Sequence, residues 1–288
     1  MPRVPALGAS LVALALALAS PGALAKSKKK AAPQLILLDG AVERVNWNDG
    51  DSFRITKGAR EGQKARLVGY NTLESYGPVH FWGGFNGWEL YRTHKAATAL
   101  AKSQQWVCSS NGTADGYGRI LVDCPELRKT LVAEGLAHVY QIEGDADPEL
   151  LAIQMKAQNE RKGMWAKGIP QAIITSVHSI DEKDPDHPDE KRTESYNRLC
   201  DTRTGKTYAF KHSAVLKPCD VFCKDGSCMV YVPFDHRYGK HKVACLKGEG
   251  GERNRMSAAA HLHQPIDPYD KGGAPPPAAD DDDDDDGH

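Results

Sequence analysis

Beyond its first 25 residues, the sequence contains no apolar run long enough to span a membrane. It also has almost no net charge, with 37 Lys and Arg against 38 Asp and Glu, so the total charge identifies no class of partner. No internal repeat is visible, which argues against a repeat protein. The hydrophobic content of 40% is ordinary for a soluble globular protein, and 288 residues suffice for one or two domains.

The first 25 residues predict a secretory signal peptide. Arg3 gives a short basic start, residues 11–18 are apolar, and residues 23–25 (Ala-Leu-Ala) fit the small-x-small cleavage pattern. The alternative is a transmembrane anchor, which is disfavoured because the apolar stretch is short and meets Pro21 and Gly22. We therefore expect an exported protein, secreted or periplasmic, that is not attached to a membrane after cleavage.

Composition divides the remaining chain into five segments. Residues 26–34 form a basic arm, and residues 35–170 have the pattern of one compact domain. Residues 171–195 are expected to be a charged linker, because a stretch rich in Asp, Glu, Lys and Pro buries little apolar surface. Residues 196–247 form a small, basic, cysteine-rich unit. Residues 248–288 are expected to be a disordered tail, which includes a run of seven Asp whose like charges repel.

The compact domain has the pattern of an α+β, mainly β, barrel. Turn residues and alternating apolar positions predict five strands, and apolar spacing predicts three helices. The expected strands are residues 35–45, 52–56, 64–70, 106–109 and 119–123, and the expected helices are residues 90–102, 127–136 and 148–162. A glycine- and aromatic-rich stretch, residues 77–87, is expected to be an exposed loop. Five strands with three helices suggest a small closed barrel with attached helices.

Three short stretches of this domain carry chemically capable side chains. The first is Asp49-Gly50-Asp51-Ser52, the second runs from Arg66 to Glu74, and the third is Asp115-Gly116-Tyr117-Gly118-Arg119. Their carboxylates and amide suit calcium or magnesium, and their arginines can grip a phosphate with two hydrogen bonds. A cation with two arginines would stabilise the negative charge that develops on an attacked phosphodiester. Each stretch alone is also compatible with an ordinary turn or a solvated strand position.

Taken in order and at this spacing, the three stretches resemble the thermonuclease, or staphylococcal nuclease-like, family. That family shows Asp-Gly-Asp-Thr, an Arg about ten residues past the strand, Asp-x-Pro-Glu, and Asp-Lys-Tyr-Gly-Arg. The resemblance extends over residues 42–165 and includes Gly163-Met164-Trp165 at its end. It implies a five-stranded oligonucleotide-binding-type (OB-type) barrel with three helices.

The resemblance also implies a role for each matching residue. Asp51, Asn71 and the main-chain carbonyl of Thr72 would bind Ca²⁺, with Asp49 in the outer shell. Glu74 would orient or deprotonate the attacking water. Arg66 and Arg119 would bind the scissile phosphate and stabilise the transition state. Tyr117 would contact a neighbouring phosphate of the substrate.

The sequence departs from the family at three site positions. Asn71 stands where the family has a metal-binding Asp, which removes one negative charge and should weaken calcium binding. Leu73 replaces a proline that stiffens the loop before Glu74, and Gly116 replaces a lysine associated with phosphate binding. Residues 77–87 do not match the family's archetype.

The seven cysteines agree with export, because exported chains oxidise their thiols. Cys108 and Cys124 lie on the two strands that flank the Asp115 turn, where strand pairing would place them within reach of a disulfide. The other five, all in residues 196–247, allow two bridges with one cysteine left over. The alternative is a zinc site that also uses nearby histidines. The C-x3-C-x4-C spacing of three of these cysteines is, however, a poor zinc pattern.

The leading hypothesis is an exported, calcium-dependent endonuclease that hydrolyses phosphodiester bonds in DNA and RNA and acts as a monomer. One alternative is a nucleic-acid-binding module that has the barrel with weak or no catalysis, which Asn71 and Leu73 favour. A second is a surface interaction protein built on the basic unit, where residues 191–255 hold 14 Lys and Arg against 7 Asp and Glu. The joint presence of Arg66, Glu74 and Arg119 argues against both.

Overall fold

The computed structural model describes residues 32–182 and 193–246. The expected signal peptide, residues 26–31 of the basic arm, the middle of the expected linker and the acidic tail lie outside these residues. None of the helices in the described ranges is both long and apolar enough to cross a membrane.

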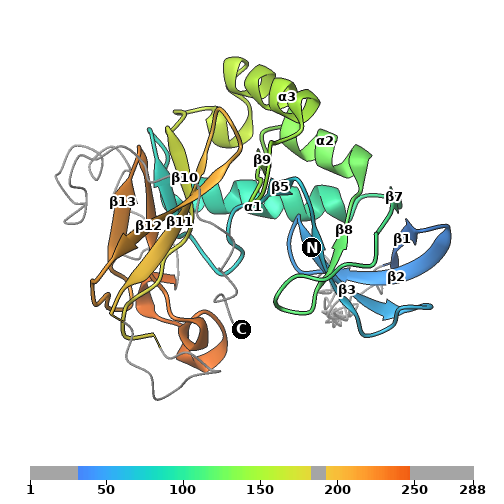
Figure 1. The fold of residues 1–288 in the computed structure, drawn as a ribbon, viewed down its shortest axis with the longest axis horizontal. Coiled ribbons are helices and arrows are strands. Elements are labelled where there is room, and N and C mark those ends of the chain that lie inside the picture. Colours follow the sequence, from blue (N-terminus) through green and yellow to red (C-terminus); the bar gives the residue numbers. More distant parts are fainter. Residues whose placement is uncertain (1–31, 183–192, 247–288) are drawn as a thin grey trace, which may run out of the picture. The chain divides into compact units, whose positions relative to one another are not determined.

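A six-stranded sheet forms the N-terminal part of the described chain, in the order β7-β1-β2-β3-β4-β8 (Figure 1). Its strands are β1 (Gln34–Leu38), β2 (Ala41–Trp47), β3 (Ser52–Lys57), β4 (Lys64–Leu67), β7 (Trp106–Cys108) and β8 (Ile120–Val122). The first four strands pair antiparallel, while β7 and β8 add parallel at the two edges. An isolated bridge between Ser109 and Asp123 joins the ends of the edge strands, so the sheet is a nearly closed barrel.

The expected strand at residues 35–45 was wrong in its extent, and the sheet has six strands rather than five. Asp39 and Gly40 both adopt positive φ, at 50° and 80°, and turn the chain back between β1 and β2. An Asp-Gly pair with positive φ at both residues makes the tightest type of hairpin turn. The same residues therefore give two paired strands where the apolar pattern alone suggested one.

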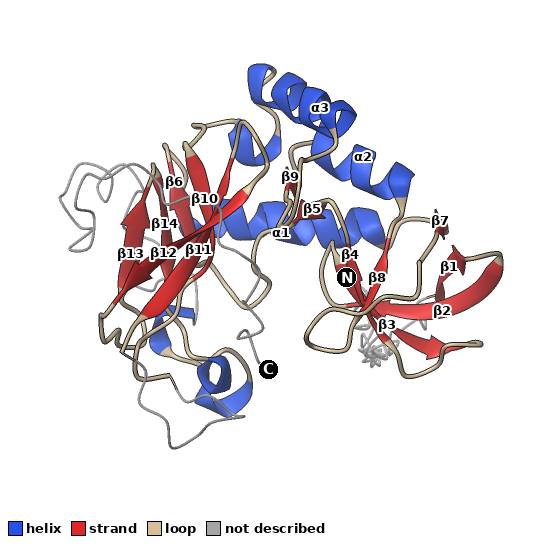
Figure 2. Cartoon of the chain, viewed as in Figure 1, coloured by secondary structure: helices blue, strands red, loops and turns tan. Residues whose placement is uncertain are grey.

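Three α-helices accompany the barrel in the described chain, as expected (Figure 2). Helix α1 (Gly87–Ala101) begins with a capping box, in which Asn86 and Glu89 each accept a backbone N–H of the other. Helix α2 (Pro125–Ala133) and helix α3 (Pro148–Asn159) both begin at proline, whose missing N–H costs nothing in a first turn. Buried side chains of α2 and α3 join those of the strands in one hydrophobic core.

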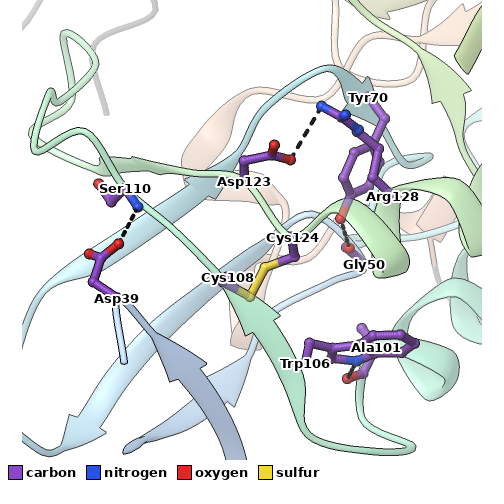
Figure 3. The surroundings of a disulfide bond; sticks show 10 residues. All are labelled: Asp39, Gly50, Tyr70, Ala101, Trp106, Cys108, Ser110, Asp123, Cys124 and Arg128. Atoms are coloured by element: carbon purple, nitrogen blue, oxygen red, sulfur yellow. Dashed lines mark hydrogen bonds and ion pairs between the residues drawn. A yellow bond between two sulfur atoms is a disulfide. The ribbon is translucent and has the colours of Figure 1, made fainter. Parts of the chain in front are cut away.

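A disulfide between Cys108 and Cys124 closes the barrel where the edge strands meet, which confirms the expected pairing (Figure 3). Cys108 ends β7, and Cys124 lies two residues past β8 as the N-cap of α2. Their Cα atoms are 4.2 Å apart, next to the Ser109–Asp123 bridge. The bond therefore crosslinks the two edge strands and the start of α2.

Two three-stranded sheets make up the C-terminal part, here called the C-terminal unit. One has the order β10-β11-β12, and the other has the order β13-β14-β6. Their strands are β10 (Ala172–Ser176), β11 (Ser195–Asp201), β12 (Thr207–His212), β13 (Val221–Lys224), β14 (Ser227–Val230) and β6 (His80–Trp82). Disulfides join Cys219 to Cys245 and Cys223 to Cys228, and Cys200 is free and buried. The buried strand β10 lies within residues 171–195, where a linker was expected.

The prediction of an exposed loop at residues 77–87 was wrong, because this stretch contains β6 and is largely buried. Phe81 pairs with Cys228 and His80 with Met229, so β6 is an edge strand of a sheet of the C-terminal unit. Trp82 is fully buried and donates its indole N–H to the carbonyl of Met164 at 2.9 Å. The aromatic residues that suggested an exposed loop pack instead against segments far away in the sequence. Two further short strands of the described chain, β5 (Tyr70–Asn71) and β9 (His138–Val139), pair antiparallel with each other.

Candidate active site

The Asp49-Gly50-Asp51 turn brings two carboxylates to the start of β3. The Asp49 Oδ1 atom accepts hydrogen bonds from the Asp51 backbone N–H at 3.1 Å and from the Ser52 hydroxyl at 2.8 Å. Gly50 allows the close approach of α1, because a Cβ there would lie 2.7 Å from Thr72 Cγ2 and 3.0 Å from Ala97 Cβ. The buried Tyr70 hydroxyl holds the turn by donating to the Gly50 carbonyl at 2.8 Å. The turn is thus fixed by local bonds and by packing.

Asp51 is buried, and its carboxylate accepts hydrogen bonds from two sides. Thr72 donates its backbone N–H at 2.6 Å and its hydroxyl at 2.9 Å to Oδ2, while Arg66 donates to Oδ1 at 2.7 Å. Burial by itself would raise the pKa of Asp51, but the Arg66 charge and the Thr72 hydrogen bonds outweigh it and lower the pKa. Asp51 is therefore a carboxylate held in one orientation.

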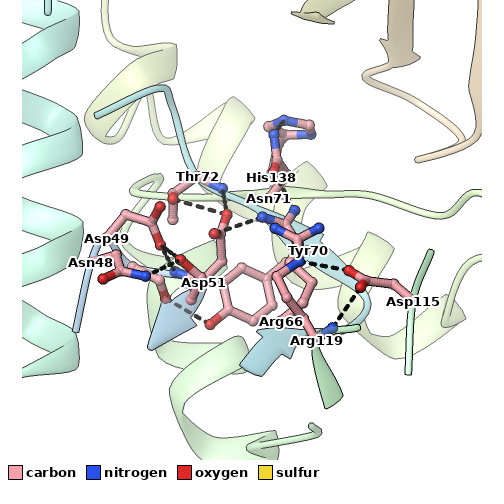
Figure 4. Close-up of polar contacts among 12 residues, drawn as sticks. Asn48, Asp49, Asp51, Arg66, Tyr70, Asn71, Thr72, Asp115, Arg119 and His138 are labelled. Carbon is pink, nitrogen blue, oxygen red and sulfur yellow. Dashed lines mark hydrogen bonds and ion pairs between the residues drawn. The ribbon is translucent and has the colours of Figure 1, made fainter. Parts of the chain in front are cut away.

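Arg66 links the two side chains that were expected to bind the metal (Figure 4). Besides its bond to Asp51, it donates from Nη2 to the Asn71 side-chain oxygen at 2.5 Å. Both oxygens thus lie against a single guanidinium group. Only two of the five N–H groups of Arg66 are used in these bonds, so the remaining ones can contact a phosphate.

Arg119 lies immediately before β8, the strand that pairs with β4, and reaches the same face of the barrel. In the parallel pairing of β4 with β8, Arg66 lies beside Leu121, two residues along from Arg119. Because side chains alternate between the faces of a strand, Arg119 and Arg66 lie on the face opposite to the buried Ala65. The two expected phosphate-binding arginines are therefore brought together by the sheet.

The turn before β8 holds Arg119 in place. Asp115 accepts the backbone N–H groups of Tyr117 at 3.1 Å and Arg119 at 2.9 Å, and its other oxygen accepts Arg119 Nε at 2.6 Å. The guanidinium carbon lies 4.8 Å from the centroid of the Tyr117 ring. Within the described chain, the Arg119 side chain donates to Asp115 through Nε, so its two terminal nitrogens can contact a ligand.

Glu74 follows the expected metal ligands Asn71 and Thr72 and is anchored by β6. Its backbone N–H donates to Nε2 of His80 at 3.3 Å, and its side chain is half-buried. Glu74 also acts on the charge of Arg66. Burial by itself would lower the pKa of Arg66, but the surrounding negative charges, Glu74 among them, outweigh burial and raise that pKa. Leu73 is 2% exposed and packs among Trp82, Leu90 and Met164, so packing anchors the loop that lacks the family's proline.

The oxygen donors fit a hard cation such as Ca²⁺. Asp51 Oδ1 comes from the turn before β3 and Asn71 Oδ1 from β5, yet both are held by the same guanidinium, and Asp49 lies next to Asp51 in the turn. These are carboxylate and amide oxygens, the donors that calcium prefers. Burial, followed by the charge of Asp51, raises the pKa of Asp49 to about 8. Within the described residues, no cluster of three or more His, Cys, Asp or Glu side chains could hold a metal.

Sequence reasoning missed three histidines around the site. His138 Nε2 lies 3.5 Å from the Asn71 amide nitrogen, His80 holds Glu74, and His94 lies on α1. All three are buried. Burial is the largest cause that lowers their pKa values, to about 3 for His80 and about 4 for His94 and His138. No short motif contains them, and only the tertiary fold brings them together.

These histidines predict a loss of stability in mild acid. The unfolded chain takes up protons at histidine near pH 6.5, whereas the folded chain keeps these three rings neutral down to about pH 4. The unfolded state then binds more protons, so the free energy of unfolding falls as the pH drops below about 6.5. Asp49 opposes this trend, because its raised pKa favours the folded state as the pH falls toward 4, but it is one group against three.

Urea denaturation at pH 7 and pH 5 measures this effect. We expect a lower midpoint at pH 5 for the wild type and a smaller difference for His80→Gln, whose amide oxygen can still accept the Glu74 N–H. Equal pH dependence in the two proteins would show that His80 does not titrate as its burial implies.

Comparison with known proteins matches part of the chain to one family. Residues 64–167 match the family model described as staphylococcal nuclease homologue, a range that holds Arg66, Asn71, Glu74 and Arg119 but begins after Asp51. No curated protein matches the chain. Over residues 64–167, the chain therefore carries a staphylococcal nuclease homologue domain.

Proposed function

We propose that the chain is an exported, calcium-dependent endonuclease that hydrolyses phosphodiester bonds in DNA and RNA. The observation that carries this proposal is the placement of Arg66 and Arg119 on one face of adjacent strands, beside the oxygens of Asp51 and Asn71. Fixed positive groups of this kind stabilise the charge that develops on the oxygens of an attacked phosphate. The nuclease homologue domain supports the same class of substrate.

In the proposed mechanism, Arg119 binds the scissile phosphate through its terminal nitrogens while Asp115 and the Tyr117 ring keep its direction. Arg66 donates to the phosphate through N–H groups that Asp51 and Asn71 do not use. Glu74, held by His80, orients the attacking water and accepts its proton. Asp51, Asn71 and the Thr72 carbonyl would hold Ca²⁺, which when bound supplies further positive charge at the phosphate.

Digestion of single- and double-stranded DNA and RNA under graded calcium tests this function. We expect cleavage of both nucleic acids that requires calcium and that Glu74→Gln reduces strongly. Binding without cleavage at any calcium concentration would instead support the alternative, a nucleic-acid-binding barrel with weak or no catalysis. Three disulfides support export into an oxidising compartment, and we expect a monomer in solution.

Asn71→Asp should lower the calcium concentration that gives half-maximal activity. A carboxylate at this position restores one negative charge to the ligand set and can still accept the hydrogen bond from Arg66. Calcium titrations of cleavage rate, supported by calorimetric binding of calcium alone, measure the change. Asp123→Asn serves as a control, because Asp123 pairs with Arg128 outside the ligand set. An unchanged or higher calcium requirement in Asn71→Asp would show that Asn71 is not a ligand.

A further inference from the structure

The C-terminal unit contains a short segment with exposed aromatic and basic side chains. Residues 233–243, here called the aromatic-basic segment, include Phe234 and Tyr238, each 55% exposed. Every other strongly exposed large hydrophobic side chain in the described chain is aliphatic: Val42, Val107, Ile142, Met155, Ile169 and Val215. The two exposed aromatic rings thus lie four residues apart in one segment, which points to a shared role.

This segment contacts the catalytic loop directly. The Tyr238 hydroxyl lies 3.3 Å from the Ser75 hydroxyl, next to Glu74. The Arg237 guanidinium lies 4.4 Å from the centroid of the buried Tyr76 ring, and its Nε donates to the Val232 carbonyl at 3.0 Å. Arg237 and Tyr76 therefore hold the segment against residues 74–76, where Tyr238 contacts Ser75. The Arg237 guanidinium also lies 5.9 Å from the centroid of the Phe234 ring, and both rings are more than half exposed.

The charge of the segment suits a polyanion. It holds Arg237, Lys240 and Lys242 against a single acid, Asp235. Lys240 is exposed and Lys242 is half-buried. Neither lysine forms an ion pair with another described residue. Unneutralised lysines next to exposed rings are the combination that binds single strands, in which the protein attracts the backbone and the bases stack on aromatic side chains.

We propose that the aromatic-basic segment is a subsite for single-stranded nucleic acid that continues the catalytic site beyond Glu74. The subsite rests on the proposed function for its position next to the cleaved bond. Phe234 and Tyr238 stack unpaired bases, and Lys240 and Lys242 contact the phosphates. Bases inside a duplex already stack on one another and cannot reach a side chain in this way, so the subsite favours single strands.

Direct binding measurements test the subsite without relying on cleavage. The full-length chain, with a chelator to prevent turnover, is titrated into fluorescent single-stranded and double-stranded oligonucleotides of the same sequence. The double variant Phe234→Ala/Tyr238→Ala should weaken single-strand binding by about tenfold or more and duplex binding much less. Lys240→Ala/Lys242→Ala should weaken both and lower the salt dependence, with a smaller slope of log affinity against log salt.

Matched variants separate stacking from general effects. Val215→Ala removes another exposed apolar side chain of the C-terminal unit, and Lys217→Ala removes another exposed lysine of that unit. Both should bind like the wild type. Tyr238→Phe retains the ring but loses the contact with Ser75, so it should keep most of the single-strand affinity if stacking is the source.

Two results would overturn the subsite: wild-type single-strand affinity in Phe234→Ala/Tyr238→Ala, or an equal loss for single strands and duplexes. In cleavage assays, the same variant should raise KM for single strands more than it lowers kcat, as expected for a group that binds substrate away from the reacting atoms. A chain that binds single strands through these rings but never cleaves them would refute the proposed nuclease and leave the subsite standing.

Discussion

Replacing Arg119 with alanine should lower kcat by about a hundredfold or more, while the fold is retained. Positioned donors that stabilise transition-state charge typically contribute that much. Arg119 is suited to this role because Asp115 engages its Nε at 2.6 Å, which fixes the direction of the guanidinium without using its terminal nitrogens. Single-turnover cleavage of a labelled strand under saturating calcium measures the chemical step directly.

The control for this experiment is Arg60→Ala. Arg60 also forms an ion pair with an aspartate, Asp39 at 2.7 Å, and has a side-chain exposure of 33%, close to the 31% of Arg119. It lies outside the candidate site and should leave kcat unchanged. Turnover of Arg119→Ala close to that of the wild type, with an unchanged circular dichroism spectrum, would remove Arg119 from the mechanism.

Asp51→Asn should both destabilise the fold and weaken calcium binding. The Asp51 carboxylate accepts from Thr72 twice and from Arg66 once, so an amide would direct its NH₂ group at one of these donors. It would also leave the partly buried Arg66 charge without its carboxylate partner. We expect the free energy of unfolding to fall by about 2–4 kcal/mol, the range for a broken buried pair with an unpaired donor.

Urea denaturation and calcium titration calorimetry, each on the wild type and Asp51→Asn, check both effects. Asp39→Asn is the matched control, because Asp39 pairs with Arg60 at the surface, where such pairs contribute about 1 kcal/mol or less. If Asp51→Asn is no less stable than Asp39→Asn, the network around Asp51 does not stabilise the fold. If it also binds calcium like the wild type, Asp51 is not a ligand.

The strand β6 gives the C-terminal unit a role in placing residues 74–76, the loop that holds the proposed catalytic Glu74. His80 accepts the backbone N–H of Glu74, and the same residue pairs with Met229 of β14. The aromatic-basic segment contacts Ser75 and Tyr76 on the other side. Glu74 is thus held between the barrel and a disulfide-bonded unit whose strands β10 to β14 lie beyond the family match, so we expect the matched domain to depend on that unit for an ordered loop.

The parts of the fold that the sequence predicted are those set by local chemistry. The Asp49 and Asp115 turns form because each side chain accepts backbone N–H groups a few residues ahead. Helix α3 begins at Pro148 because Asp147 caps it, and its start was expected from those two residues. The Asp39-Gly40 turn was also visible in principle, because an Asp-Gly pair favours a two-residue hairpin turn, but the apolar pattern around it predicted one continuous strand.

Local chemistry along the chain sets the order and spacing of the carboxylates, the amide and the arginines, together with the turns that present them. The fold decided which of these groups meet: because β4 pairs parallel with β8, Arg119, just before β8, lies on the same face as Arg66, and the fold brings Asn71 to the guanidinium that holds Asp51. It also decided that β6 is buried and that three neutral histidines surround the site. The physical reason is that burial and strand pairing depend on partners far away in the chain, 149 residues apart for His80 and Met229, which no local pattern encodes.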